Sequence, residues 1–541
     1  MRISLISLAA SLVAPALALS ASRCTPETFT PYLTSNASLV YAVPYSPNDT
    51  FVGPMSNYSG LPEYCAVYVN ISSSSSSSYE FGLWLPTTTW NKRYIAYGNG
   101  GFTGQIAFDD MAPGLFYGFA TVSTNTGHNS TVHEAGDAQW ALNAPEVRTD
   151  WGWRALHGSV AMGKILTEAF YSEDIKYSYY SGCSTGGRQG LKSLQMFPED
   201  FDGVLAGACA WWTSHMQNWD LKVATYNLPN NASHHITEEL MDVLGAEVLR
   251  QCDAVDGLKD NIITNGYACD FRPETLLCDS PTANTSTCFN ADQIDTVKKI
   301  YGGWIDVNQT FVFPSIAYGA ESQLAQMIMT DDDEQDSPSG IAYPRDFIYN
   351  DPDWPWQNLD LETIQLSDKL DPGNATADDF DLRPFMKRGG KLIHYHGFAD
   401  GEIPTSSSIY FYNQVLKTLK PLGVDLDQFY RFYLIPGMEH CLDSVHDAPW
   451  YIASANQPSG LTATNTWSVP GFKDRKHDAL MALMSWVENG TSPTELIATK
   501  FVDDNPTLGV QAQRPLCPYP QEAKYTGGDW NTTSAFTCTK T

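Results

Sequence analysis

The chain has 541 residues, of which 43% are hydrophobic and 12% aromatic, so it can bury a large core and form more than one compact unit. Its formal net charge of −29 argues against nucleic acid and anionic membrane as partners, because an acidic surface repels phosphates and acidic lipid heads. A neutral or aromatic small molecule is compatible with this charge.

The first 20 residues are typical of a secretion signal. They combine a basic start at Arg2 with an apolar run and with small residues at Ala16, Ala18 and Ser20 that suit cleavage. We therefore expect a secreted, extracellular protein, and no later stretch stays apolar long enough to span a bilayer. Frequent N-x-[ST] sites indicate a glycosylated surface, although chance is the alternative. These sites are Asn36, Asn48, Asn57, Asn70, Asn129, Asn231, Asn284, Asn308, Asn374, Asn489 and Asn531.

Strand-like runs follow one another from Cys24 to about Ala210, with a helical segment at about 151–171. This alternation predicts an α/β fold with a doubly wound, mostly parallel sheet. The serine run 72–78 lies between two strand-like stretches and predicts a flexible hairpin tip. The strand-like runs are YEFGLWL at 79–85, RYIAYG at 93–98, YGFATVS at 117–123, YSYYSG at 177–182 and FDGVLAGA at 201–208.

The pattern changes over residues 211–387, where short helical pieces, acidic clusters, proline turns and closely spaced cysteines replace the strand rhythm. We interpret this segment as an inserted lid domain. Strand-like runs resume at 391–397 and 428–437, so residues 21–210 and 388–541 are expected to form the two parts of one core.

The stretch GCSTG at 182–186 matches the G-x-S-x-G motif and stands between a strand-like run and a helical run, as that motif requires. The glycines permit a sharp turn that lifts the Ser184 hydroxyl into a cleft. The N-terminus of the following helix offers N–H groups to a developing oxyanion. An ordinary glycine-rich turn is the alternative.

A serine nucleophile needs a histidine base held by a carboxylate, in the chain order Ser, Asp or Glu, His. Asp400 follows one predicted strand and His440 follows the next, at the ends where open α/β sheets carry their functional groups. Glu402 is a rival acid and His446 a rival base. A solvated turn aspartate and a packed loop histidine are the structural alternatives.

Two cysteines flank these candidates, since Cys183 precedes Ser184 and Cys441 follows His440. A disulfide between them would hold their Cα atoms roughly 4.4–6.8 Å apart and bring nucleophile and base into contact range. Cys183 would then be a link between loops and not a nucleophile, because its thiolate is consumed. Two unrelated cysteines with other partners are the alternative, because spacing does not reveal connectivity.

The oxyanion also needs a second N–H donor, which this architecture takes from a glycine-rich loop after an earlier strand. The stretch GNGG at 98–101 stands in that place. We assign the backbone N–H groups of Thr185 and Gly101 as the two donors, with a plain β-turn as the alternative for the loop.

Together, Cys183-Ser184, Asp400 and His440-Cys441 resemble the CS-D-HC arrangement of the tannase and feruloyl esterase family. The segments GNGGFTG, TNTGHNS, WALNAPE, DWGWRALHGS, GCSTGGRQG, HYHGFAD and LIPGMEHC also look like that family, so the resemblance extends over most of the mature chain. It implies an α/β-hydrolase core with a lid inserted before the strand that carries the acid.

The resemblance further implies a structural calcium ion in the lid and no organic cofactor. Hard cations need several oxygens at close range, and a solvated acidic turn is the alternative. The implied ligands are the side chains of Asp253, Asp256 and Asp260 and the backbone carbonyls of Leu258 and Ile262. The implied disulfides are Cys252–Cys269, Cys278–Cys288, Cys517–Cys538 and Cys24–Cys65, which leaves Cys209 as the odd one among eleven cysteines.

The expected function is that of a secreted serine carboxylic ester hydrolase acting on phenolic esters, with a small phenolic ester or a feruloylated polysaccharide as substrate. WALNAPE and DWGWRALHGS look closer to the feruloyl esterase branch, and a tannase acting on galloyl esters is the alternative. A catalytically silent binding protein with this fold is a more remote one. Trp211 and Trp212 are candidates for an aromatic wall around the phenolic ring.

Overall fold

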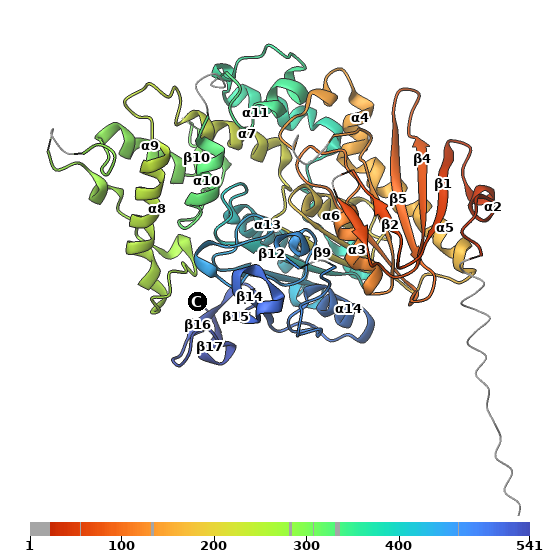
Figure 1. Cartoon of the computed structure of the whole chain (residues 1–541). Coiled ribbons are helices and arrows are strands. Elements are labelled where there is room, and N and C mark those ends of the chain that lie inside the picture. The colour runs from red at the N-terminus through yellow and green to blue at the C-terminus, as the bar shows by residue number, and fades with distance from the viewer. Residues whose placement is uncertain are drawn as a thin grey trace, which may run out of the picture.

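A computed structural model describes residues 22–54, 56–130, 135–280, 284–306, 308–330, 336–463 and 465–540. The expected signal segment lies outside the described residues. Within them, nine strands form one central sheet, which confirms the predicted α/β class (Figure 1). In sheet order the strands are β1 (Ala37–Tyr45), β4 (Tyr64–Ser72), β5 (Ser78–Pro86), β7 (Phe119–Thr124), β6 (Arg93–Tyr97), β8 (Tyr177–Cys183), β9 (Gly203–Gly207), β12 (Lys391–Gly397) and β13 (Tyr430–Ile435).

Strand directions divide this sheet into two parts. From β1 to β7 the neighbours are antiparallel, and from β7 to β13 they are parallel. Strands β8 and β9 are buried along almost their whole length, because helices cover both faces, although β8 includes Ser178 and Ser181. β12 pairs directly with β9, so the sheet resumes after the insertion as expected.

Helices pack on both faces of the sheet and divide the core into two apolar layers. One layer includes Val160 of α5 and Leu191 of α6, and the other includes Leu115 of α3 and Leu483 of α14. The helices of the core are α2 (Pro26–Phe29), α3 (Phe108–Phe116), α4 (Pro145–Thr149), α5 (Ala155–Tyr171), α6 (Thr185–Met196), α13 (Thr405–Leu419) and α14 (Ala479–Asn489).

The serine hairpin is present between β4 and β5, but its tip is attached to the body of the protein. The hydroxyls of Ser73 and Ser77 donate to the buried carboxylate of Asp150 at 2.7 and 2.5 Å. Asp150 begins a π-helical segment, Asp150–Arg154, that leads into α5, so the helix expected at 151–171 is two joined pieces. The tip is thus anchored by hydrogen bonds that composition alone does not predict.

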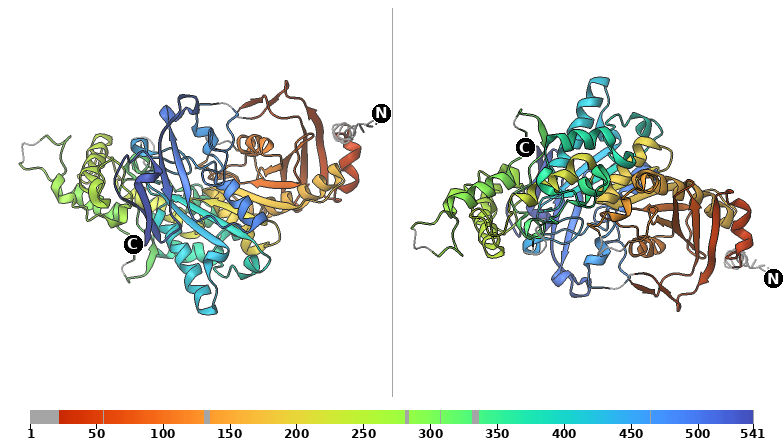
Figure 2. Two further views of the ribbon diagram at one scale, coloured as in Figure 1. Left: turned by 90° about the horizontal axis from the view of Figure 1, so that it is seen from below. Right: turned by 90° about the horizontal axis from the view of Figure 1, so that it is seen from above.

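The insertion between β9 and β12 is mostly helical and has an apolar core of its own, which includes Leu244 and Val297. Its α8–α9 part lies at the opposite end of the molecule from strand β1 (Figures 1 and 2). Its last residues, including Leu382 and Phe385, pack into the core of the sheet. The elements are α7 (Thr213–Thr225), α8 (Glu238–Cys252), α9 (Ala291–Tyr301), β10 (Trp304–Ile305), β11 (Phe311–Phe313), α10 (Glu321–Ile328), α11 (Leu361–Leu370) and α12 (Arg383–Lys387).

Small two-stranded sheets complete the structure beside the central one. Tyr433 of the edge strand β13 forms a β-bridge with Pro518, so the C-terminal segment covers part of that edge. In the described part of the chain, no helix is both long and apolar enough to cross a membrane. The small strands are β2 (Thr50–Val52) with β3 (Asn57–Ser59), β14 (Leu496–Phe501) with β15 (Val510–Leu516), and β16 (Gln521–Tyr525) with β17 (Phe536–Lys540).

Candidate active site

Ser184 occupies a sharp turn between β8 and α6. Its φ of 62° and ψ of −125° lie in a region that side chains rarely adopt. The turn fits because its neighbours are glycines: a Cβ on Gly98 would lie 2.5 Å from the Cα of Gly186. The Ser184 N–H donates to the carbonyl of Gly207 at 3.0 Å. This geometry is the strained strand-to-helix turn that the G-x-S-x-G motif predicts.

The glycine-rich loop 98–101 is held against α6 by a reciprocal amide pair. Asn99 N–H donates to Gln189 Oε1 at 3.0 Å, and Gln189 Nε2 donates to Asn99 Oδ1 at 3.0 Å. Gly101 adopts a φ of +48°, and a Cβ there would lie 2.6 Å from the carbonyl oxygen of Ala135. Gly101 and Thr185 line the same cavity as Ser184. The sequence placed this loop correctly but gave no sign of the Asn99–Gln189 pair.

Asp400 and His440 meet at the ends of β12 and β13. His440 Nδ1 lies 2.7 Å from Asp400 Oδ2. The other oxygen of Asp400 accepts the backbone N–H groups of Glu402 at 2.9 Å and Ile403 at 2.7 Å. Glu402 is instead 3.7 Å from His440 Nε2, with a side chain that is 54% exposed. His446 lines a different cavity, so the geometry favours Asp400 and His440 over both rivals.

The charges around His440 favour its protonated form. Burial alone would lower its pKa, but the charges of Asp400 and Glu402 and the hydrogen bond to Asp400 outweigh burial and raise the pKa to about 9. Burial would likewise raise the pKa of Asp400, yet the charge of His440 and the hydrogen bonds from His396 and His440 lower it. Asp400 is therefore ionised throughout the physiological range.

A disulfide joins Cys183 to Cys441, with Cα atoms 5.8 Å apart across 258 residues of sequence. It places Ser184 and His440 on neighbouring loops, and both residues line one cavity. Within the described residues no hydrogen bond joins their side chains, and such bonds often tighten only when substrate binds. The structure also contains the other four expected bridges, and Cys209 is buried and unpaired.

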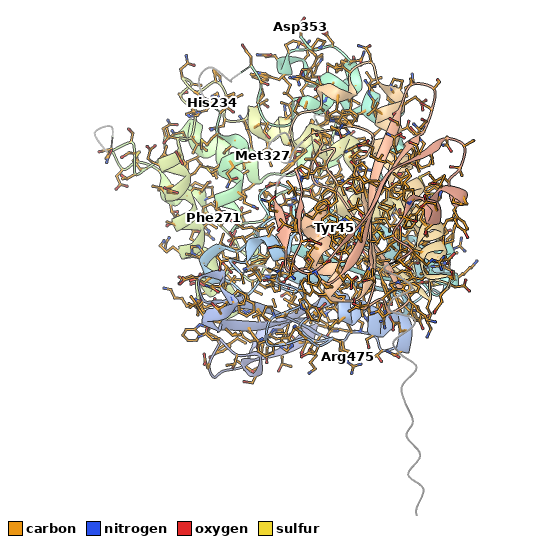
Figure 3. All side chains as sticks on the ribbon, turned by 45° about the vertical axis from the view of Figure 1, so that its right-hand side comes forward. Tyr45, His234, Phe271, Met327, Asp353 and Arg475 are labelled. Atoms are coloured by element: carbon orange, nitrogen blue, oxygen red, sulfur yellow. A yellow bond between two sulfur atoms is a disulfide. The ribbon has the colours of Figure 1, made fainter. Side chains whose placement is uncertain are left out.

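The cavity has a volume of about 830 Å³ and lies between the core and the insertion. Met216 and Met327 are among the apolar side chains that the insertion adds to its wall, and Met327 is labelled in Figure 3. Trp211 and Trp212 do not line it. They stack on each other, with ring centroids 5.2 Å apart, and Trp211 is buried in the core of the sheet. The sequence of an aromatic pair beside the lid boundary does not reveal whether its rings face the core or the cavity.

Asp220 of α7 also lines this cavity. Its Oδ1 is buried and has no hydrogen-bond partner among the described residues. Burial raises its pKa well above the usual value, and the charge of Glu402 adds to that rise. The insertion thus places a carboxyl group with an unused oxygen beside His440, which sequence reasoning did not identify.

Gln323 of α10 connects the insertion to the loops of Asp400 and His440. Its Oε1 accepts the backbone N–H of His440 at 2.8 Å and that of Gly401 at 3.2 Å. A Cβ on Gly401 would lie 2.4 Å from the backbone nitrogen of Leu324, so glycine is required where α10 contacts this loop. No sequence signal pointed to Gln323.

The aspartates expected to bind calcium lie in one turn after α8. Asp253 accepts the backbone N–H groups of Asp260 at 3.2 Å and Asn261 at 2.9 Å. Burial raises the pKa of Asp253, and the charges of Asp260 and Asp256 raise it further. The negative charges are therefore gathered, as a cation site requires.

One ion pair in this turn competes with a metal ion for Asp260. Asp260 is ion-paired with the buried guanidinium of Arg514. Leu258 and Ile262, the expected carbonyl donors, lie in the same turn, and the N–H groups that they donate to Asp256 and Asp260 do not involve their carbonyl oxygens. Throughout the ranges that the structure describes, no three His, Cys, Asp or Glu side chains are grouped closely enough to hold a metal ion. Calcium at this turn therefore stays a prediction.

Comparison with known proteins agrees with this geometry. A sequence model described as "Tannase and feruloyl esterase" matches residues 65–539. A probable feruloyl esterase B-1 from Neosartorya fischeri is 34% identical over 510 residues, which cover 93% of this chain and 90% of that protein.

Solved structures give the same result. The crystal structure of feruloyl esterase B from Aspergillus oryzae matches with a TM-score of 0.86 at 31% identity, covering 96% of this chain and 100% of that one. A tannin acyl hydrolase from Aspergillus niger shares the fold, with a TM-score of 0.72 at 23% identity, covering 96% of this chain and 95% of that one. This chain therefore belongs to the tannase and feruloyl esterase family.

Proposed function

We propose that this protein is a secreted serine carboxylic ester hydrolase that cleaves feruloyl (hydroxycinnamoyl) esters of plant cell-wall polysaccharide. The observation that carries the proposal is the disulfide between Cys183 and Cys441, because it brings Ser184 and His440 to one cavity while Asp400 holds the far nitrogen of His440. Secretion is supported by five disulfides, which persist in oxidising compartments.

The proposed reaction begins when Ser184 Oγ attacks the ester carbonyl carbon and His440 Nε2 takes the hydroxyl proton. The oxyanion that forms is stabilised by the backbone N–H groups of Thr185 and Gly101. The C–O bond to the alcohol then breaks, and the alcohol leaves with the proton from His440. Asp400 accepts the Nδ1–H throughout, which keeps Nε2 directed at the reacting atoms and stabilises the imidazolium.

Water completes the cycle. His440 Nε2 takes a proton from a water molecule, the hydroxide attacks the acyl-enzyme carbonyl, and the Ser184 oxygen leaves with that proton. The free acid departs and the enzyme is regenerated. No step requires a cofactor.

The substrate class rests on the cavity and on the relatives. A volume of about 830 Å³ is within the range of sites that enclose small organic ligands. The relatives at 31% and 34% identity are named feruloyl esterase B, whereas the tannin acyl hydrolase is 23% identical. These similarities favour a hydroxycinnamoyl group over a galloyl group.

Initial rates on methyl ferulate, methyl caffeate and methyl gallate test the proposal with purified protein. We expect hydrolysis with a preference for methyl ferulate or methyl caffeate, and loss of hydrolysis in Ser184→Ala. A preference for methyl gallate would assign the enzyme to the tannase branch. A parent protein inert on all three esters, with unaltered thermal unfolding, would favour a binding protein instead.

A further inference from the structure

A row of buried polar side chains leads through the core to Asp400. Their exposed fractions are all 1% or less, although the surroundings are the apolar layers of the sheet. Neighbouring polar atoms lie within hydrogen-bond distance along the whole row. The members are Tyr430 on β13, His394 and His396 on β12, Ser408 on α13, and Asp400.

The end of the row that touches Asp400 fixes the position of one hydrogen. His396 Nε2 lies 2.9 Å from Asp400 Oδ2 and 3.0 Å from the carbonyl oxygen of Ile403. Both of these oxygens are acceptors, so Nε2 must carry the hydrogen and donate. In a neutral ring the other nitrogen, Nδ1, then accepts from the Ser408 hydroxyl at 2.7 Å.

The remaining hydrogens follow from this assignment. Because Ser408 donates to His396, its oxygen accepts from His394 Nε2–H at 3.0 Å. His394 Nδ1 in turn accepts from the Tyr430 hydroxyl at 2.8 Å. Burial holds the pKa of His394 well below its usual value, which agrees with a neutral ring. Each hydroxyl and ring N–H of the row is thus used as a donor, with all hydrogen bonds directed toward Asp400.

We propose that His396 is a positioning residue for Asp400, acting through its Nε2–H in the esterase mechanism on which this inference rests. Oδ2 receives the N–H groups of His396 and His440, and Oδ1 receives those of Glu402 and Ile403. Four donors occupy the acceptor sites of the carboxylate, so it cannot rotate away from His440. Because His396 shares Oδ2, it also draws electron density from the bond to His440 and limits the proton affinity of that ring.

The proposal predicts two separable effects in His396→Leu. Without the Nε2–H, Asp400 loses one of its four restraints, so kcat falls by about tenfold or more. His396 does not line the cavity, so KM stays near that of the parent. The negative charge available to His440 increases, so its pKa rises and the acid limb of the kcat profile moves to higher pH.

Neighbouring charges do not change in this variant. Glu402 and Asp220 also face His440, and Glu439 and Tyr267 face Asp400. A shift of the acid limb in His396→Leu therefore reports the loss of the His396 ring beside Asp400. His396→Gln, which keeps an N–H donor on a side chain of similar reach, is expected to restore most of kcat and to move the limb back toward the parent.

Tyr430→Phe is the matched control, because it removes a buried hydroxyl from the same row without touching Asp400. The proposal expects Tyr430→Phe to lose stability yet to retain the parental acid limb. Ser408→Ala gives a milder test if His396→Leu does not fold: its limb should move in the same direction by a smaller amount. Equal losses of kcat in Tyr430→Phe and His396→Leu, or a folded His396→Leu with the parental kcat and limb, would overturn the proposal.

The pKa of His440, measured by NMR with ¹⁵N-labelled histidine, provides a readout that needs no turnover. If the parent protein hydrolyses no ester, the proposed function fails. A higher His440 pKa in His396→Leu than in His396→Gln would still support the role of His396. Equal values in the two variants would contradict it.

Discussion

Replacing both Cys183 and Cys441 with serine is expected to lower stability and activity by different amounts. The bridge spans 258 residues, and loop-closure entropy, 2.1 + 1.5R ln n in cal/mol/K, gives about 5.6 kcal/mol at 25 °C. The bridge between Cys517 and Cys538 spans 21 residues and gives about 3.3 kcal/mol by the same relation. For a chain of this size the larger figure lowers Tm by about 5 °C.

The loss of the two bridges is expected to differ more in its effect on kcat than in its effect on Tm. Without the Cys183–Cys441 link, only non-covalent contacts hold the His440 loop beside Ser184, so kcat should fall sharply at temperatures where the protein is still folded. The Cys517/Cys538 double serine variant lacks a bridge whose cysteines do not line the cavity, so it should keep the parental kcat. Calorimetry gives Tm, and methyl ferulate hydrolysis gives kcat. A folded Cys183/Cys441 variant with the parental kcat would refute the claim that this bridge assembles the site.

Three further predictions concern charge, the insertion and calcium. Because the charge of Glu402 helps to raise the pKa of His440, and catalysis needs the deprotonated ring, activity should rise with pH through that pKa. Glu402→Gln should move this rise in activity to lower pH by a fraction of a pH unit. The shift should be smaller at high salt, because the side chain of Glu402 is half exposed. A shift to higher pH would contradict the claim that the charge of Glu402 raises the pKa of His440. Gln323→Ala leaves two backbone N–H groups without their acceptor, which costs about 1–3 kcal/mol for each, and should reduce kcat; a folded variant with the parental kcat would exclude positioning by Gln323. Calorimetry with EDTA and then with added Ca²⁺ tests the predicted calcium ion. We expect EDTA to lower Tm, and Ca²⁺ but not Mg²⁺ to restore it. An unchanged Tm would remove calcium from the proposal.

The sequence predicted best those parts of the fold that depend on residues close together in the chain. The run at 391–397 coincides with β12, because a short run that includes Leu392, Ile393 and Tyr395 favours a buried strand. The turn at Ser184 was predictable because only glycines tolerate its close contacts. Strand β1 was missed, since it lies at the sheet edge and its burial pattern is irregular.

Long-range contacts explain the rest. Glutamine and histidine are common residue types, so nothing in the sequence marks Gln323 or His396 as important. Their importance depends on contacts with Asp400 and His440 that no spacing rule predicts. The anchoring of the serine hairpin has the same origin, because Asp150 lies more than 70 residues from both of its serine partners. Trp211 and Trp212 are an example of the opposite error. Their residue type suggested a cavity wall, but in the structure they stack on each other and do not line the cavity.

The insertion between β9 and β12 has a consequence for biosynthesis. A ribosome releases Ser184 well before His440, and at about 5–20 residues per second the interval is on the order of 10 to 50 seconds. During that time the nascent chain has the proposed nucleophile without its base, so it cannot hydrolyse esters by the proposed mechanism. Competence would begin only when the C-terminal strands dock onto β9 and the disulfide bond between the two loops has formed.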